Sequence, residues 1–250
     1  MSTWIKVSPF RTIPQNYKQR DTLNNLYKIH VTFNTVTPAC TCTGEVKVDL
    51  AEKKTTYLGY RVNEKPSIMG SSIKGVLSTY ALIVSNKPSL VGDLFGYEKL
   101  ESRVYVEDGI VINGNYKVMK LGRQWRPRKQ NNGIKVYTMA KTSPTGEPVL
   151  FEALLPETKF STEITIFNSD TDEICLLLAS MGISSGRNYG IKIGRGKDKG
   201  FGIIRVESFT VRELDPKTFT LKDVNKDPFV ECASKLLKNR WDNVKQSFFS

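Results

Sequence analysis

The order of its apolar patterns is the feature that most constrains how this chain can fold. Residues 27–36 alternate apolar and polar side chains, which predicts a half-buried strand. Apolar residues then recur at helical spacing between Gly70 and Asn86, and Ser71 or Ser72 would cap that helix.

The later patterns complete an order of strand, helix, strands, helix, strand. This order matches a ferredoxin-like (RRM-like) β-α-β-β-α-β core of the α+β class. We expect a single domain over residues 1–250, with insertions at about 41–66 and 114–148. The remaining segments are strands at 104–106 and 110–112, a hairpin of strands 149–155 and 160–167, a helix from about Asp172 to Gly182, a strand at 203–214 and a third helix from Asp227.

Residues 182–202 contain seven glycines and five cations, with Asp198 as the single acid. Glycine allows a close approach of the main chain to a ligand, and clustered cations supply the field that a polyanion needs. The glycine spacing fits neither nucleotide-phosphate fingerprint, so we expect the phosphates of a nucleic-acid chain. A flexible surface loop with solvated lysines is the alternative.

The overall charge agrees with a polyanionic partner. The formal net charge is +12, which favours nucleic acid or an acidic surface. No apolar run reaches the length of a membrane span, and residues 1–15 lack the apolar core of a signal peptide. We therefore expect a cytoplasmic protein without a membrane partner.

The long segment 114–148 is also basic, with eight cations against the single acid Glu147. Its aromatic residues and methionines indicate an ordered projection, since disordered tracts are poor in such residues. Cations interleaved with flat side chains suit single-stranded nucleic acid, whose bases stack on aromatic rings. A charged loop whose apolar residues fold back onto the core is an equal alternative.

Lys74 lies in the first turn of the predicted helix, where a cation opposes the helix dipole by roughly 0.3–1 kcal/mol. An anion bound at the helix start would make both the lysine and the free N–H groups favourable contacts. A solvated lysine that tolerates the penalty is the alternative.

The cysteines and the one histidine do not predict a metal site. Cys40 and Cys42 are close in sequence but have C-x-C spacing, while Cys175 and Cys232 are isolated. A zinc site would need two more ligands, and His30 lies on the polar face of its strand. We expect structural or free thiols and no disulfide framework.

Four motifs occur in a characteristic order: residues 68–75 (IMGSSIKG), 94–96 (LFG), 102–108 (SRVYVED) and 194–202 (GRGKDKGFG). Together they resemble the successive signatures of the RAMP superfamily, the repeat-associated RNA-binding proteins of CRISPR systems. The similarity is strongest to the backbone subunits of type III effector complexes. Residues 146–160 also resemble the stretch that follows the protruding thumb of those subunits.

The resemblance implies an RRM-like core whose copies associate along a guide RNA together with other effector subunits. It implies that the helix start and the glycine-rich loop contact the guide backbone. The thumb, here residues 114–148, would insert between bases of the guide and target duplex. The residues expected to bind RNA are Ser71, Ser72, Lys74, Arg123, Trp125, Arg126, Arg128, Arg187, Lys192, Arg195, Lys197 and Lys199.

In catalytic members of that family, an aspartate in the loop after the first strand promotes metal-dependent cleavage of target RNA. Alignment on Arg61 puts the position of this acid near Thr55 or Thr56, where this chain has no acid. Asp49 is the best candidate, and it would act with Mg²⁺ or Mn²⁺. An ordinary solvated carboxylate is the alternative.

Two other functions remain open from the sequence. One is a free-standing endoribonuclease that processes CRISPR precursor RNA, since relatives with similar glycine-rich loops cleave such RNA. The other is a generic single-stranded RNA-binding protein outside CRISPR systems. The large insertion at 114–148 favours a subunit of an assembly.

Overall fold

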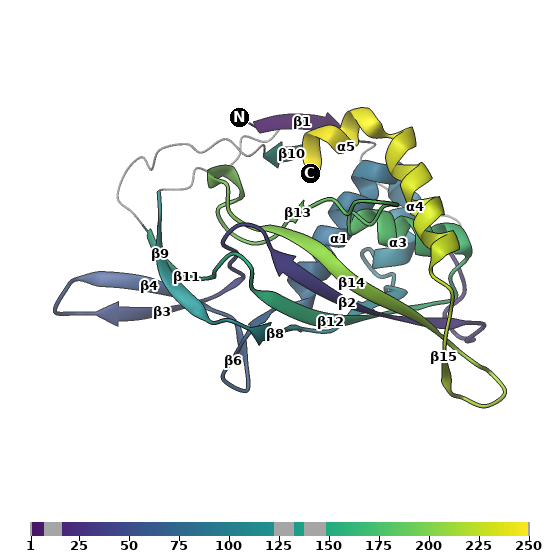
Figure 1. Ribbon diagram of the computed structural model, residues 1–250, viewed down its shortest axis with the longest axis horizontal. Helices are drawn as coiled ribbons and strands as arrows, with labels where there is room; N and C mark the ends of the chain where they lie inside the picture. Colours follow the sequence, from purple (N-terminus) through teal and green to yellow (C-terminus); the bar gives the residue numbers. More distant parts are fainter. Residues whose placement is uncertain (1, 8–16, 123–132, 138–148, 250) are drawn as a thin grey trace.

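The computed structural model describes residues 2–7, 17–122, 133–137 and 149–249, and it has a mixed α+β architecture (Figure 1). The helices are α1 (Gly70–Ser85), α2 (Pro88–Phe95), α3 (Thr171–Ser180), α4 (Asp227–Asn239) and α5 (Trp241–Ser247), with a 3-10 turn at Lys197–Lys199. The strands are β1 (Ser2–Lys6), β2 (Leu26–Thr35), β3 (Cys42–Asp49), β4 (Lys54–Gly59), β5 (Arg61–Val62), β6 (Lys65–Ile68), β7 (Val104–Val106), β8 (Gly109–Asn113), β9 (Tyr116–Leu121), β10 (Gly133–Tyr137), β11 (Val149–Leu154), β12 (Lys159–Phe167), β13 (Ile191–Lys192), β14 (Ile203–Leu214) and β15 (Leu221–Asp223).

The largest sheet has the strand order β13-β14-β2-β12-β8-β6-β5. Its centre is antiparallel, since β2 pairs with β14 on one side and with β12 on the other. The predicted alternation of β2 is confirmed: Ile29, Val31 and Phe33 are buried, and His30 is exposed. This alternation gives the sheet one apolar face, which the helices cover.

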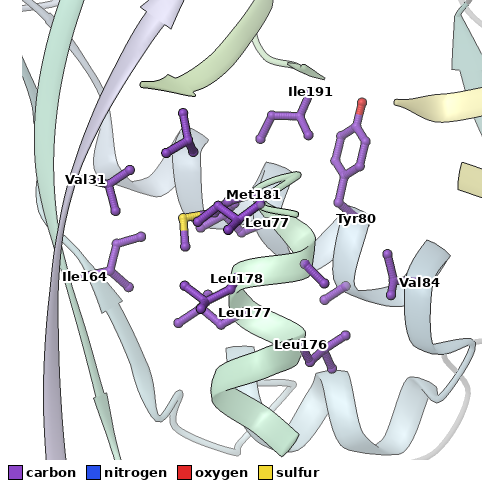
Figure 2. Packing of buried hydrophobic residues seen from close by; sticks show 14 of the residues in the cluster. Val31, Leu77, Tyr80, Val84, Ile164, Leu176, Leu177, Leu178, Met181 and Ile191 are labelled. Carbon is purple, nitrogen blue, oxygen red and sulfur yellow. The ribbon is translucent and has the colours of Figure 1, made fainter. Parts of the chain in front are cut away.

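Helices α1 and α3 lie on that face. Figure 2 shows Val31 and Ile164 of the central strands pointing toward Leu177 and Leu178 of α3. Helix α3 begins with a capping box, in which the side chain of Asp170 accepts from the backbone N–H of Glu173 and the Glu173 side chain accepts in return. Helix α4 packs outside α3.

The predicted hairpin of residues 149–155 and 160–167 is wrong. Strand β11 pairs with β4 and β9 in a second sheet of order β3-β4-β11-β9, whereas β12 belongs to the central sheet. Between the two strands the chain returns to the end of β2, where the backbone N–H of Thr35 donates to the Thr158 carbonyl at 2.9 Å. Residues 149–155 (VLFEALL) and 160–167 (FSTEITIF) both have strand-like apolar content, and this content does not reveal their different partners.

The predicted serine cap of α1 is also wrong. The helix begins at Gly70 with Met69 as its N-cap, and the N-cap side chain forms no capping hydrogen bond. Instead, the Asp108 carboxylate accepts the Gly70 N–H at 2.7 Å and the Tyr60 hydroxyl at 2.7 Å. A Cβ at Gly70 would lie 2.3 Å from the Val106 carbonyl oxygen, so glycine permits this close approach.

The expectation of free or structural thiols is corrected by two disulfides. Cys40 is bonded to Cys42, and Cys175 of α3 is bonded to Cys232 of α4. Each pair has its Cα atoms 5.7 Å apart, which is within the normal range for a disulfide. The second pair is 57 residues apart in sequence and is brought together only by the packing of α3 on α4.

A buried ionic cluster joins α2, α3 and Arg103, the residue that precedes β7. Arg103 is fully buried and donates to Asp93 at 2.7 Å and to Glu173 at 2.5 Å. Arg20 reaches Asp93 from outside, and Lys18 reaches Glu173. We call these five side chains the Arg103 cluster.

Both expected insertions carry strands. Residues 41–66 form the β3–β4 hairpin, β5 and the start of β6, and Figure 1 shows the β3–β4 hairpin projecting away from the central sheet. Residues 114–148 contribute β9 and β10, and β10 pairs with β1. Within the described ranges, no helix has the length and apolarity needed to cross a membrane.

Candidate nucleic-acid interface

A cleft of about 460 Å³ brings together the start of α1 and the glycine-rich loop within residues 182–202. Helix α1 contributes Ser72, and the glycine-rich loop contributes Gly194 to Asp198. The insertions supply the aromatic residues Tyr57 of β4 and Tyr137 of β10. The other lining residues come from the segment around the first disulfide: Cys40, Thr41, Cys42 and Gly44.

The glycine-rich loop is fixed against the chain segment that follows β2. The Arg195 N–H donates to the Cys40 carbonyl at 3.0 Å, and the Gly202 N–H donates to the Pro38 carbonyl at 2.8 Å. Gly194 has φ of 76°, and a Cβ there would lie 2.0 Å from the Cys40 carbonyl oxygen. Part of the glycine content therefore serves the fold itself, by letting two backbone segments meet.

The cations of this loop differ in their surroundings. The Arg195 guanidinium lies 4.3 Å from the centre of the Tyr57 ring, which is a stacking distance. Burial lowers the pKa of Lys197, whose side chain borders the same cleft. Among the residues that the structure describes, Arg195, Lys197 and Lys199 form no ion pair with a carboxylate.

Lys192 lies beneath the loop. Only 4% of it is exposed, and its Nζ donates to the Lys197 carbonyl at 2.7 Å. Burial lowers the pKa of Lys192 to about 8, and the negative charge of Asp198 opposes part of this shift. Lys192 therefore holds the 3-10 turn from below. Arg187 is exposed on the preceding loop and is not part of the cleft lining.

At the start of α1, the three residues predicted to bind RNA have different surroundings. Ser72 lines the cleft, and Ser71 is exposed. The Lys74 ammonium lies 5.9 Å from the centre of the Tyr105 ring, and burial lowers the pKa of Lys74. Its side chain thus packs on β7, and it is not among the described residues that line the cleft.

Asp49 is the last residue of β3 and not a loop residue as expected. It is exposed, and its carboxylate accepts the backbone N–H of Glu52 at 3.0 Å. In the described part of the chain, no group of three or more His, Cys, Asp or Glu side chains could hold a metal ion. Arg61, on which the family alignment rests, forms a two-point ion pair with Glu152.

Four predicted RNA-binding residues lie outside the described residues: Arg123, Trp125, Arg126 and Arg128. In contrast, Tyr57 was not predicted, although it forms part of the cleft wall. It lies in the mixed segment 41–66, and only its stacking with Arg195 distinguishes it from other strand tyrosines. Asp198, the single acid of its segment, also lines the cleft.

A protein-family model described as RAMPs, RAMP superfamily, matches residues 32–205. The chain is also similar to a chain in the cryo-EM structure of the Type III-B Cmr-beta bound to cognate target RNA, with 15% identity and a TM-score of 0.47. That alignment covers 75% of this chain and 61% of the other, so this chain spans less than two thirds of it. A search of curated proteins finds no match. The family match includes Ser72 and the loop residues of the cleft.

Proposed function

Because this chain belongs to the RAMP superfamily, we propose that it is a guide-RNA-binding subunit of a type III CRISPR effector ribonucleoprotein. The observation that carries this proposal is the convergence of Ser72 and the glycine-rich loop on one cleft. These two segments are distant in sequence, and each one was expected to contact phosphates. Their meeting at one site is what a single RNA-binding surface requires.

The core of this subunit would be ferredoxin-like within one domain. The order β14-β2-β12, with β7 and β8 on the far side of β12, supports this proposal. Along the chain, α1 lies between β2 and β7, and α3 lies between β12 and β14. Two β-α-β units produce this combination of chain order and strand order.

The affinity would come from contacts to phosphates. Arg195, Lys197 and Lys199 provide cations without carboxylate partners in the described part of the chain, and the net charge of +12 attracts a polyanion from a distance. The thumb-like segment 114–148 would add contacts to bases, and copies would associate along the guide next to other effector subunits. Tyr137, the last residue of β10 in this segment, lines the cleft.

Cleavage of target RNA is a separate hypothesis that rests on Asp49. Its exposed carboxylate could bind a divalent cation or accept a proton. An assembled complex with Asp49→Ala should lose target cleavage and keep guide binding if this hypothesis holds. Unchanged cleavage by that variant would remove Asp49 from the reaction.

The central experiment compares salt titrations of guide-RNA binding. Replacement of Arg195, Lys197 and Lys199 by alanine should weaken binding strongly and lower the slope of log K against log salt by about 2, as expected for three lost contacts to a single strand. The control variant Lys217→Ala/Lys235→Ala/Lys238→Ala changes the net charge equally on exposed residues elsewhere. Equal slopes in both variants would contradict the proposal. Cleavage of repeat RNA by the protein alone would favour the precursor-processing alternative.

A further inference from the structure

Strand β3 is the outermost strand of the second sheet. In the order β3-β4-β11-β9, its one neighbour among the strands that the structure describes is β4. The other edge of β3 therefore presents backbone groups that pair with no described strand, and such an edge is a template for a further strand. Figure 1 shows the β3–β4 hairpin projecting from the central sheet, so a second chain can approach this edge without displacing the core.

One face of β3 is apolar. Val46 is paired with Tyr57 of β4, and Tyr57 is paired with Phe151 of β11, so these three side chains lie on the same face of the sheet. Phe151 is fully buried, whereas Val46 and Val48 are 43% and 55% exposed. Leu50, at the start of the turn, is 85% exposed. The apolar face of the sheet thus continues onto β3, where no described residue buries it.

The opposite face of β3 carries charges. Lys47 and Asp49 alternate with the two valines, and both are exposed. The Asp49 carboxylate accepts the Glu52 N–H, but neither Lys47 nor Asp49 forms an ion pair with another residue in the described ranges. A cation and an anion, two residues apart on one edge strand, are therefore available to a partner.

We propose that β3 is a contact between two copies of this chain, which pair antiparallel about Val48. In this register Lys47 lies opposite the partner's Asp49, and Asp49 lies opposite the partner's Lys47. On the other face, Val48 lies opposite the partner's Val48, and Val46 lies opposite the partner's Leu50. Cross-strand pairs of opposite charge and pairs of apolar side chains both stabilise a sheet.

The neighbouring registers are less favourable. Pairing about Lys47 would place this lysine against its own copy and Glu45 against the partner's Asp49, and like charges opposite each other destabilise a sheet. Pairing about Val46 would place Val48 opposite the partner's Gly44 and lose an apolar contact. The order of side chains in residues 46–50 therefore selects the register about Val48.

This contact goes beyond the proposed RNA binding and does not depend on it. A two-fold contact uses the same strand on both copies and closes at two, whereas association along an RNA adds copies head to tail. A contact limited to one strand buries less area than stable interfaces do, so we expect a weak and reversible dimer.

The first test is sedimentation equilibrium of the full chain without RNA, at low salt and at concentrations up to about 1 mM, since small interfaces bind weakly. The unmodified chain should show a reversible equilibrium between monomer and dimer. Lys47→Asp and Asp49→Lys should each weaken the dimer at least roughly tenfold, because each puts like charges opposite one another at two positions. A mixture of the two variants should dimerise again, and so should the double variant Lys47→Asp/Asp49→Lys.

The matched controls are Lys65→Asp and Glu64→Lys, which make the same changes of charge at exposed residues between β5 and β6. Both should keep the dimer of the unmodified chain.

A second test locates the two-fold axis. Val48→Cys should form a covalent dimer on mild oxidation, since Val48 lies opposite its own copy. Val46→Cys should not, because the two copies of this residue would be roughly 14 Å apart, too far for a disulfide.

Several results would overturn the proposal and leave RNA binding at the cleft intact. They are a chain that stays monomeric at every concentration, a dimer that both single charge variants leave unchanged, a mixture of these variants that stays monomeric, and equal cross-linking of Val48→Cys and Val46→Cys. Charge variants that lose RNA affinity without any change in dimerisation would mean that RNA occupies this edge, which also overturns it.

Discussion

The Arg103 cluster and the cleft both concentrate cations, but the partners of these cations differ. Arg103 is fully buried between two carboxylates, and each carboxylate has a second cation outside it. Arg195 instead lies on an aromatic ring, without a carboxylate partner among the described residues. The difference separates cations that hold the fold together from cations that are available to a polyanion.

This difference has a physical origin. A buried charge without a partner costs several kcal/mol, so every member of a buried cluster needs its counter-charge. A cation at the edge of a cleft stays solvated and can exchange water for phosphate. The first arrangement resists change, and the second can bind and release a ligand.

The largest expected effect is the loss of the buried cation. Arg103→Met should lower the free energy of unfolding by about 3–5 kcal/mol, because two carboxylates remain buried without their shared partner. Urea unfolding measures this loss. Arg212→Met, which removes a partly exposed partner of Glu163, should cost no more than about 1 kcal/mol. Comparable losses in the two variants would contradict the distinction between the regions.

The two disulfides provide a second contrast between the regions. The bond from Cys175 to Cys232 closes a long loop next to the Arg103 cluster, so Cys175→Ser/Cys232→Ser should cost roughly 2–4 kcal/mol. The bond from Cys40 to Cys42 closes a minimal loop at the cleft, and its removal should cost only roughly 1 kcal/mol. Thermal unfolding of both double serine variants tests this order. A larger loss of stability on removal of the Cys40–Cys42 bond would contradict this order.

Lys192 combines features of both environments, since it is a buried cation that lies below the cleft loop. Its pKa of about 8 in the folded protein lies below its ordinary value of 10.5, so the unfolded chain binds more protons between these values. Stability should therefore rise with pH across this window, by up to about 1.4 kcal/mol per pH unit.

Urea unfolding at pH 7.5, 8.5 and 9.5 measures this contribution. The rise should be smaller in Lys192→Met, and it should persist in Lys238→Met, which removes an exposed lysine of α4. The same dependence in all three proteins would show that Lys192 is not the titrating group.

Features with strong local periodicity could be predicted from the sequence. The alternation of β2 and the helical spacing of α1 each identify an element, because one side of it must be apolar. The start of α1 and the glycine-rich loop, both predicted to contact phosphates, also lie at the cleft. Of the predicted residues that the structure describes, three line it: Ser72, Arg195 and Lys197.

The features that could not be predicted depend on partners that are distant in sequence. The apolar content of residues 149–155 does not indicate that β11 joins β4 and β9. Asp108 caps α1 from the connection between β7 and β8, and Cys175 meets Cys232 only after α3 and α4 pack. Tyr57 was missed for the same reason, since its role arises from contact with Arg195.

The most direct test of the account maps where bound RNA touches the protein. Ultraviolet cross-linking of the full chain to guide RNA, followed by mass spectrometry of the linked peptides, should identify Tyr57, Tyr137 and the loop at 194–199. The control is the variant without the loop cations Arg195, Lys197 and Lys199, in which these links should weaken together. Links confined to β15 and α4, with none at the cleft, would contradict the claim that this cleft is the RNA-binding site.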